Sequence, residues 1–172
     1  MIFISFCSLL CGCGVRRGGQ SPLPEELKVW SDVNFSAEGV NRYRVNISFG
    51  EGGISGIMMV SLNGSTYKGT VVNEFGIRGF NFICSASETK LTDVMTFIDK
   101  WYIRRTIAAD LQMLFCADLP DYTPSGGLTR RETGGELTVE AGKGERRVVR
   151  QAGGNVTMEN MKRNITYSLS VM

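Results

Sequence analysis

Histidine is absent from this chain of 172 residues, and proline occurs only four times. Because histidine is the commonest general base and a common metal ligand, its absence excludes Ser-His-Asp and Cys-His catalysis. The patterns Gly-x-Ser-x-Gly, Gly-x-x-x-x-Gly-Lys and Cys-x-x-Cys are also missing. We therefore expect no enzymatic activity, no catalytic residue, no metal site and no cofactor. A carboxylate pair brought together by folding, as in glycosidases, is the one enzymatic alternative.

An excess of charge of either sign is missing too. The 19 basic and 17 acidic residues are interspersed and leave a formal net charge of +2. Nucleic-acid-binding surfaces need clustered positive charge, so we expect no nucleic-acid partner. Glycine, in contrast, is abundant with 21 residues, and Val, Ile, Phe and Tyr often alternate with polar residues. This composition favours an ordered, β-rich fold.

The most informative stretch is the apolar run over residues 2–13, Ile-Phe-Ile-Ser-Phe-Cys-Ser-Leu-Leu-Cys-Gly-Cys. A bilayer-spanning helix needs about 20 apolar residues, whereas this shorter run with a small-residue end is typical of a secretory signal. Leu10-Cys11-Gly12-Cys13 resembles the lipobox of bacterial lipoproteins, in which the last Cys receives the lipid. The resemblance implies that residues 1–12 are a signal peptide and that Cys13 is the lipidation site. A buried, Cys-rich N-terminal strand is the structural alternative.

Residues 13–22 would then be the lipidated Cys and a flexible tether, since glycines, a Ser and a Pro dominate them. Arg16 and Arg17 add attraction to anionic lipid, about 1 kcal/mol each near a charged surface. The lipoprotein resemblance implies that an Asp after the lipidated Cys favours inner-membrane retention, and Gly14 stands there instead. We expect a membrane partner through acyl chains such as palmitate, and a location at the periplasmic face of the outer membrane.

Residues 23–172 are expected to form a single β-rich domain. Only two cysteines of the chain lie in it, Cys84 and Cys116. In an oxidising compartment they form either one disulfide or two buried free thiols, and the sequence leaves both alternatives open.

Strict alternation predicts the strands of this domain. Between residues 41 and 49, Tyr43, Val45, Ile47 and Phe49 alternate with polar residues, which indicates a strand with one buried face. Asn63-Gly64 predicts a hairpin turn because both residues tolerate positive φ. Further strands are expected over residues 54–62, 65–75, 77–85, 91–97, 136–140, 146–151 and 164–171.

Helical periodicity occurs in two places, a short first helix over residues 23–33 and a main helix over residues 99–115. In the main helix an apolar stripe on one face consists of Ile103, Ile107, Leu111 and Leu114. Asp110 and the other polar residues are expected on the remaining faces of this helix. The expected fold class is α+β, a strongly curved antiparallel sheet or open half-barrel with this helix packed over the concave face.

Several motifs between residues 40 and 115 have a family resemblance. They are Ser55-Gly56-Ile57-Met58-Met59-Val60, Asn73-Glu74-Phe75-Gly76-Ile77, Phe80-Asn81-Phe82 and Asp110-Leu111. The set resembles small Bacteroidetes-type outer-membrane lipoproteins of no assigned activity. It is more distantly similar to the LolA/LolB lipoprotein-carrier fold, an open half-barrel with helices at its mouth. Asn81 replaces the acid that those lipoproteins carry in Phe-Asp-Phe.

The strands and the main helix together present a large apolar surface. We expect it to bind a hydrophobic ligand, an acyl chain or another lipoprotein, without catalysis. The alternative is a structural or interaction lipoprotein with a filled core, accessory to an outer-membrane complex. The residues expected to line the ligand cavity are Tyr43, Val45, Ile47, Met58, Val60, Leu62, Phe80, Phe82, Met95, Phe97, Ile103, Ile107 and Leu111.

Overall fold

The structure is a computed structural model that describes residue 35 and residues 39–172. The expected signal peptide, Cys13, the tether and the short helix over residues 23–33 lie outside the described residues.

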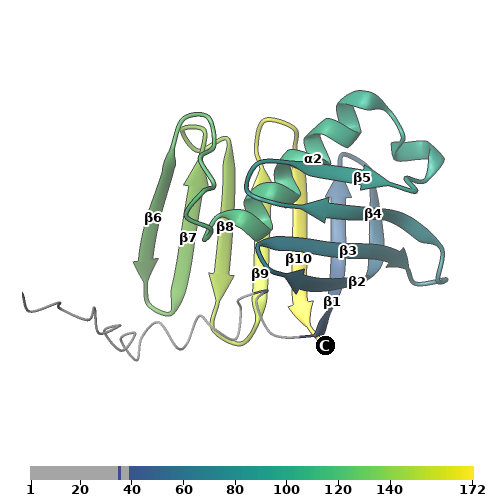
Figure 1. The fold of residues 1–172 in the computed structure, drawn as a ribbon, viewed down its shortest axis with the longest axis horizontal. Helices are drawn as coiled ribbons and strands as arrows, with labels where there is room; N and C mark the ends of the chain where they lie inside the picture. Colours follow the sequence, from purple (N-terminus) through teal and green to yellow (C-terminus); the bar gives the residue numbers. More distant parts are fainter. Residues whose placement is uncertain (1–34, 36–38) are drawn as a thin grey trace, which may run out of the picture.

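Ten strands form one antiparallel sheet in the order β5-β4-β3-β2-β1-β10-β9-β8-β7-β6 (Figure 1). The chain builds this sheet as two meanders of five strands, which are joined where β1 pairs with β10. The edges of the sheet are β5 and β6, so the sheet is open. The strands are β1 (Val40–Phe49), β2 (Gly52–Asn63), β3 (Thr66–Asn73), β4 (Arg78–Cys84), β5 (Thr89–Thr92), β6 (Leu128–Thr133), β7 (Glu136–Ala141), β8 (Arg146–Gln151), β9 (Asn155–Asn160) and β10 (Ile165–Val171).

The alternation of β1 gives the register that the sequence predicts. Tyr43, Val45 and Ile47 are buried, whereas Arg44 and Asn46 between them are exposed. A slip of one residue would reverse these faces, so the pattern fixes how β1 pairs with β2 and β10. The predicted turn at Asn63-Gly64 is also confirmed, with Gly64 at a φ of 61° between β2 and β3.

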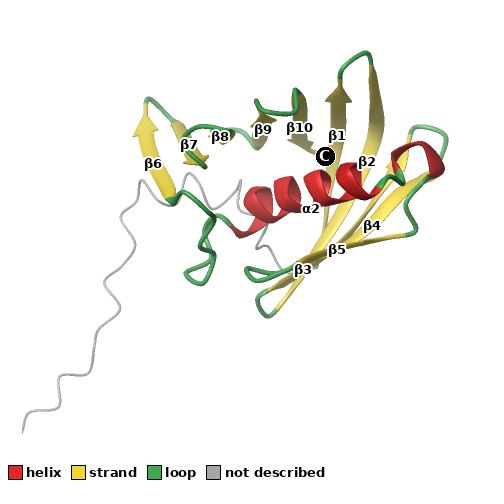
Figure 2. Ribbon diagram, turned by 90° about the horizontal axis from the view of Figure 1, so that it is seen from above, coloured by secondary structure: helices red, strands yellow, loops and turns green. Residues whose placement is uncertain are grey.

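One α-helix lies within the described residues, α2 (Trp101–Cys116), after the short 3₁₀ helix η1 (Thr96–Ile98). The chain leaves the sheet at the edge strand β5, runs through α2 and re-enters at the other edge strand, β6. On this path α2 contacts β4 and β5 of the first meander and β8 and β9 of the second (Figure 2). The sequence therefore predicts the main helix to within two residues at each end, and the coarse class is an open antiparallel sheet with a helix.

The sequence predicts eight strands and misses β6 and β9. In β6, Leu-Thr-Arg-Arg-Glu-Thr, one residue is apolar and none is buried, because this edge strand does not need a dry face. In β9 the apolar positions are Val156 and Met158, too short an alternation to detect. The strand expected over residues 91–97 is wrong beyond Thr92, since residues 96–98 form η1.

Candidate functional site

The residues expected to line a cavity are mostly packed against one another. The hydrophobic core is a single cluster of buried side chains that contains nine of them at 4% exposure or less: Tyr43, Val45, Ile47, Met58, Val60, Phe80, Phe82, Ile107 and Leu111. Leu62, Met95 and Ile103 are half-buried and pack against the same cluster. A side chain that lined an empty, water-sized space would retain accessible surface there, so the near-zero exposure of this set indicates a filled face.

Phe97 is the exception, because half of its surface is exposed. The segment after β5 turns into η1, and this turn directs Ile98 into the core in its place. The ring of Phe97 instead lies 6.2 Å from that of Phe49, near the end of β1. Phe97 therefore lies outside the buried core, unlike the other residues expected to line the cavity.

The centre of the core is an aromatic cluster around Phe115 of α2. Its ring centroid lies 4.5 Å from that of Phe35 and 5.3 Å from those of Tyr67 and Phe82. Phe35 also contacts Tyr43 edge-on at 5.2 Å. Fully burying one such ring contributes about 1.5–3 kcal/mol, with a further 0.5–1.5 kcal/mol for a well-placed aromatic pair. Phe35, which precedes the sheet in the sequence, therefore completes the core that α2 and the strands build.

Glycine makes room for one of these rings. Gly69 on β3 stands opposite Phe82 on β4. A Cβ at residue 69 would lie 2.3 Å from Cζ of Phe82, which is shorter than any allowed contact. A larger residue at 69 would therefore displace Phe82 from its stack on Phe115.

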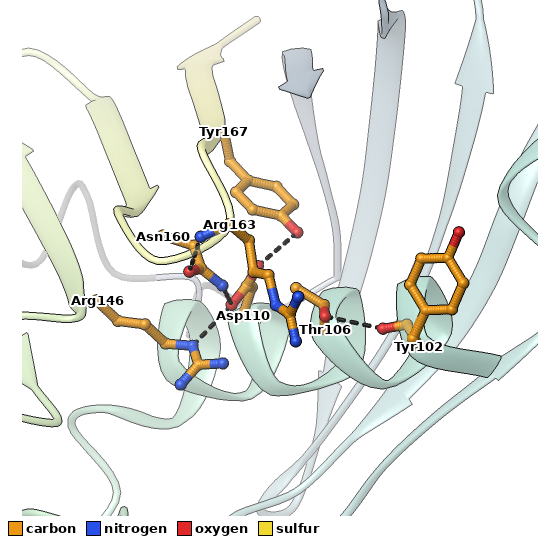
Figure 3. Close-up of polar contacts among 7 residues, drawn as sticks. All are labelled: Tyr102, Thr106, Asp110, Arg146, Asn160, Arg163 and Tyr167. Carbon is orange, nitrogen blue, oxygen red and sulfur yellow. Dashed lines mark hydrogen bonds and ion pairs between the residues drawn. The ribbon is translucent and has the colours of Figure 1, made fainter. Parts of the chain in front are cut away.

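Beside the aromatic cluster lies a buried polar network centred on Asp110 of α2 (Figure 3). Arg146 Nε and Asn160 Nδ2 each donate to Asp110 Oδ1 at 2.8 Å, and the Tyr167 hydroxyl donates to Oδ2 at 3.0 Å. These three partners come from β8, β9 and β10, so one carboxylate ties the helix to three strands. The network corrects the sequence prediction that Asp110 lies away from the packed side of the helix.

Burial changes the ionisation of this network. Desolvation raises the pKa of Asp110 above its usual value, while the charge and hydrogen bond of Arg146 and the hydrogen bonds from Asn160 and Tyr167 oppose the rise. Burial and the Asp110 carboxylate together raise the pKa of Tyr167 well above its usual value. Tyr167 therefore stays protonated at all ordinary pH values and serves Asp110 as a hydrogen-bond donor.

The C-terminal end of α2 is held by arginines. Arg150, buried on β8, pairs with Asp118 and directs Nη2 to the carbonyl of Leu114 at 3.4 Å. Arg130 on β6 donates to the carbonyl of Ala117 and lies 3.4 Å from Asp118. Positive charge at a helix C-terminus complements the helix dipole and its free carbonyls. Asp118 is therefore an ion-pair partner as well as a loop residue.

Exposed large apolar side chains gather at one end of the sheet. We call this surface the aromatic end and define it by Phe75, Ile77, Phe97, Trp101 and Tyr102, with Phe75 87% and Trp101 75% exposed. Phe75 and Ile77 belong to the β3–β4 turn, and the other three belong to the segment from η1 to the first turn of α2. The β3–β4 turn and the start of α2 lie at the same end of the sheet (Figures 1 and 2). Next to them, the Met95 amide before η1 donates to the Gly79 carbonyl of β4 at 2.8 Å. The β3–β4 turn itself is built by Asn73, whose side chain accepts hydrogen bonds from the amides of Phe75 and Ile77.

Two of the hollows are lined by described residues, and charged or other polar side chains contribute to both linings. One lies between β5 and α2, and the other on the outer face of β1 and β2; of the predicted cavity residues, only Val45 borders either. The first is lined by Thr89, Lys90, Leu91, Thr92, Arg104, Arg105 and Ala108. The second is lined by Arg44, Val45, Asn46, Ser55, Gly56, Ile57, Glu74 and Met172.

Residues 35 and 39–172 contain no group of three or more Cys, Asp or Glu side chains placed to hold a metal ion. In the same part of the chain no helix has the length and apolar character that crossing a membrane requires.

No protein-family model matches the chain, and no curated protein matches it in sequence.

Proposed function

We propose that this protein is a lipid-anchored cell-envelope protein that acts through its surface, as an accessory to an outer-membrane complex, without catalysis. The observation that carries the proposal is the packing of the predicted cavity residues into one core of near-zero exposure. A face that is already filled leaves the outer surface for function, and the aromatic end brings five exposed large apolar side chains of the described residues to one end of the sheet.

We further propose that the sheet is a half-barrel whose concave side is filled by α2 and its aromatic cluster. Support comes from the path of the chain, which crosses from edge strand β5 to edge strand β6 through α2. The contacts of α2 with both meanders support the same arrangement. In such a half-barrel the helix occupies the place that a ligand would take in an open one.

The membrane anchor in this proposal is a lipid on Cys13, at the periplasmic face of the outer membrane. Its support is the lipobox-like Leu10-Cys11-Gly12-Cys13 followed by a Gly-rich tether. Replacing Cys13 with Ser is expected to abolish labelling with a fatty-acid analogue and to remove the protein from the membrane fraction. Continued labelling of that variant would refute the assignment, and loss of labelling only on Cys11→Ser would move the site to Cys11.

For the aromatic end we propose one occupant, an apolar patch on a protein of the outer-membrane complex. Exposed Trp, Tyr and Phe side chains are enriched where protein interfaces form, and Trp and Tyr are frequent hot-spot residues. The tether allows this contact, since its nine residues after Cys13, residues 14–22, can span roughly 30 Å at about 3.3 Å per residue. The protein can therefore remain anchored while its aromatic end reaches a partner beside the membrane.

A photo-crosslinking amino acid at residue 101 tests this surface in living cells. The matched control places the same amino acid at residue 131, which is exposed on the opposite edge strand β6. We expect a discrete protein adduct from residue 101, none from residue 131, and loss of the adduct when Phe75 and Phe97 are changed to Ser. Lipid adducts alone at residue 101 would replace the protein partner with the bilayer, and no adduct at all would refute the surface.

One observation favours a second function, the binding of a hydrophobic ligand in the half-barrel. Phe35 inserts its ring into the aromatic cluster from outside the sheet and the helix, at 1% exposure. An acyl chain or the lipid of another lipoprotein would fit the same place if the Phe35 segment moved away. Phe35→Ala should then increase uptake of a fluorescent fatty acid, whereas a core that is permanently filled would bind none before or after the change.

A further inference from the structure

The two cysteines of the described domain lie side by side in the core. Cys84 ends β4 and Cys116 ends α2, and their sulfur atoms are 3.4 Å apart although 31 residues separate them in the sequence. Both are free, and both have zero exposure. A disulfide joins sulfurs about 2.0 Å apart, so a small adjustment of the two side chains would bring these atoms into bonding distance.

The surroundings make the two thiols unequal. The hydrogen bond with Cys116 lowers the pKa of the Cys84 thiol, burial opposes this change, and the Thr89 hydroxyl, which donates to Cys84 Sγ at 3.1 Å, lowers it further. The same thiol–thiol contact, together with burial, raises the pKa of Cys116. Cys84 is therefore the thiol that more readily forms a thiolate, and a thiolate is the nucleophile in disulfide exchange.

We propose that Cys84 and Cys116 form an intramolecular disulfide that fastens the C-terminal end of α2 to β4. The inference rests on the proposed envelope location, because an oxidising compartment supplies the oxidant, the disulfide of a dithiol oxidase or of oxidised glutathione. The thiolate of one cysteine attacks one sulfur of that disulfide and expels the other as a thiolate. The second cysteine then attacks the first, forms the Cys84–Cys116 bond and expels the second thiolate. The two cysteines lose two electrons, and the oxidant leaves as two thiols that carry both protons.

Burial sets when the bond forms. With both sulfurs inaccessible in the folded protein, an oxidant reaches them only while α2 is not yet docked on β4. Oxidation should therefore be fast during refolding and slow once the reduced protein has folded. The finished bond closes the chain from residue 84 to residue 116, which includes β5 and nearly all of α2.

The test uses the full chain with Cys7, Cys11 and Cys13 changed to Ser, so that two thiols remain. After refolding with oxidised glutathione, neither thiol is expected to react with maleimide when the protein is unfolded again in denaturant, and the mass should be lower by two hydrogen atoms. Oxidised protein should unfold at a higher urea concentration than reduced protein. In the Cys84→Ala/Cys116→Ala control, reductant should not change the midpoint. If both thiols can still be alkylated after refolding in oxidant, the disulfide is refuted.

A second experiment distinguishes a failure of the disulfide proposal from a failure of the proposed envelope location. Acid quenching and alkylation of cells that express the native chain report the state of Cys84 and Cys116 in place. A bond that forms both in vitro and in cells supports both proposals. A bond that forms in vitro while the cellular thiols stay reduced refutes the disulfide as a feature of the native protein and refutes the oxidising location. A chain that is lipidated at Cys13 but whose thiols stay reduced in both arms refutes the disulfide alone.

Discussion

The two meanders hold helix α2 in different ways. Against β4 and β5 the contact is mainly apolar, with Phe82 stacked on Phe115 and Ile98 buried in the same core. The polar contacts on this side reach backbone carbonyls: Gln112 Nε2 donates to Ser85 and Ala86, and Arg104 donates to Leu91. Among the described residues this side has no buried ion pair, since the side chains of Arg104 and its partner Asp99 are 41% and 44% exposed.

Against β8, β9 and β10 the same helix is held by buried charge. Asp110 is fully buried with Arg146, Asn160 and Tyr167, and Arg150 is buried beside Asp118. Arg150 Nε has no hydrogen-bond partner in the described part of the chain, so this side is less completely satisfied. A buried ion pair contributes little net stability to the fold. Removing one partner is nevertheless costly, because it leaves the other charge buried and unpaired.

This difference indicates which kinds of substitution each meander tolerates. The first meander depends on close apolar packing that excludes water, so a new charge introduced there would have no partner. The second meander already contains charges with fixed partners, and its stability depends on their ionisation. We therefore expect the first meander to respond to changes of volume and polarity and the second to changes of pH.

The largest loss of stability should come from a charge placed in the apolar core of the first meander. Val45→Asp would bury an unpaired carboxylate at a site of 1% exposure and should destabilise the protein by about 3–5 kcal/mol. Arg44→Glu, one residue away on the exposed face, should stay within about 0.5 kcal/mol of the parent. Urea unfolding of both variants measures the contrast. Equal effects at the two positions would contradict the register of β1.

The next effect concerns the helix itself. Ile107 is buried at 1% exposure, and Ile107→Ala should cost about 2–5 kcal/mol if the face is filled. In an open carrier the same change would cost less and would alter the uptake of a fluorescent fatty acid. Ile103, which is half-buried on the same helix, provides the matched control and should cost less than Ile107. A small loss of stability accompanied by increased probe uptake would favour the carrier.

The smallest effect should be a pH dependence of stability that comes from the buried charges of the second meander. Because burial raises the pKa of Asp110 above 3.8, the folded protein keeps this proton over a pH interval in which the unfolded chain has lost it. The stability that the group contributes is therefore full below pH 3.8 and is lost as pH rises through the folded pKa. Asp110→Asn has no proton to lose, so the free energy of unfolding should shift in favour of the variant with rising pH.

The Asn substitution is a fair test because it can keep the hydrogen bonds. Its side-chain oxygen can accept from Arg146 and Asn160, and its amide can donate to the hydroxyl of Tyr167. We expect a change of less than about 1.5 kcal/mol near neutral pH. Urea midpoints of the parent and the variant across acid and neutral pH give the difference, and parallel curves would show that Asp110 keeps the ionisation of an exposed acid.

The same contrast shows what the sequence can predict. Alternation in β1 and β2 and the apolar stripe of α2 report burial directly, so the sequence predicts the buried faces of these two strands and the apolar stripe of the main helix. The Asp110 network could not be predicted, because its partners lie 36, 50 and 57 residues further along the chain and polar residues carry no periodic signal. One local signal does exist, since Asp110 stands inside an otherwise apolar segment, Ile107-Ala-Ala-Asp-Leu.

The most direct measurement is native mass spectrometry of the chain from Ser21 onwards, purified without added lipid. A filled core predicts a single species at the mass of the bare polypeptide, and Phe35→Ala should give the same result. A stoichiometric acyl-chain or lipid adduct that survives purification would contradict the filled core and would make the half-barrel a carrier.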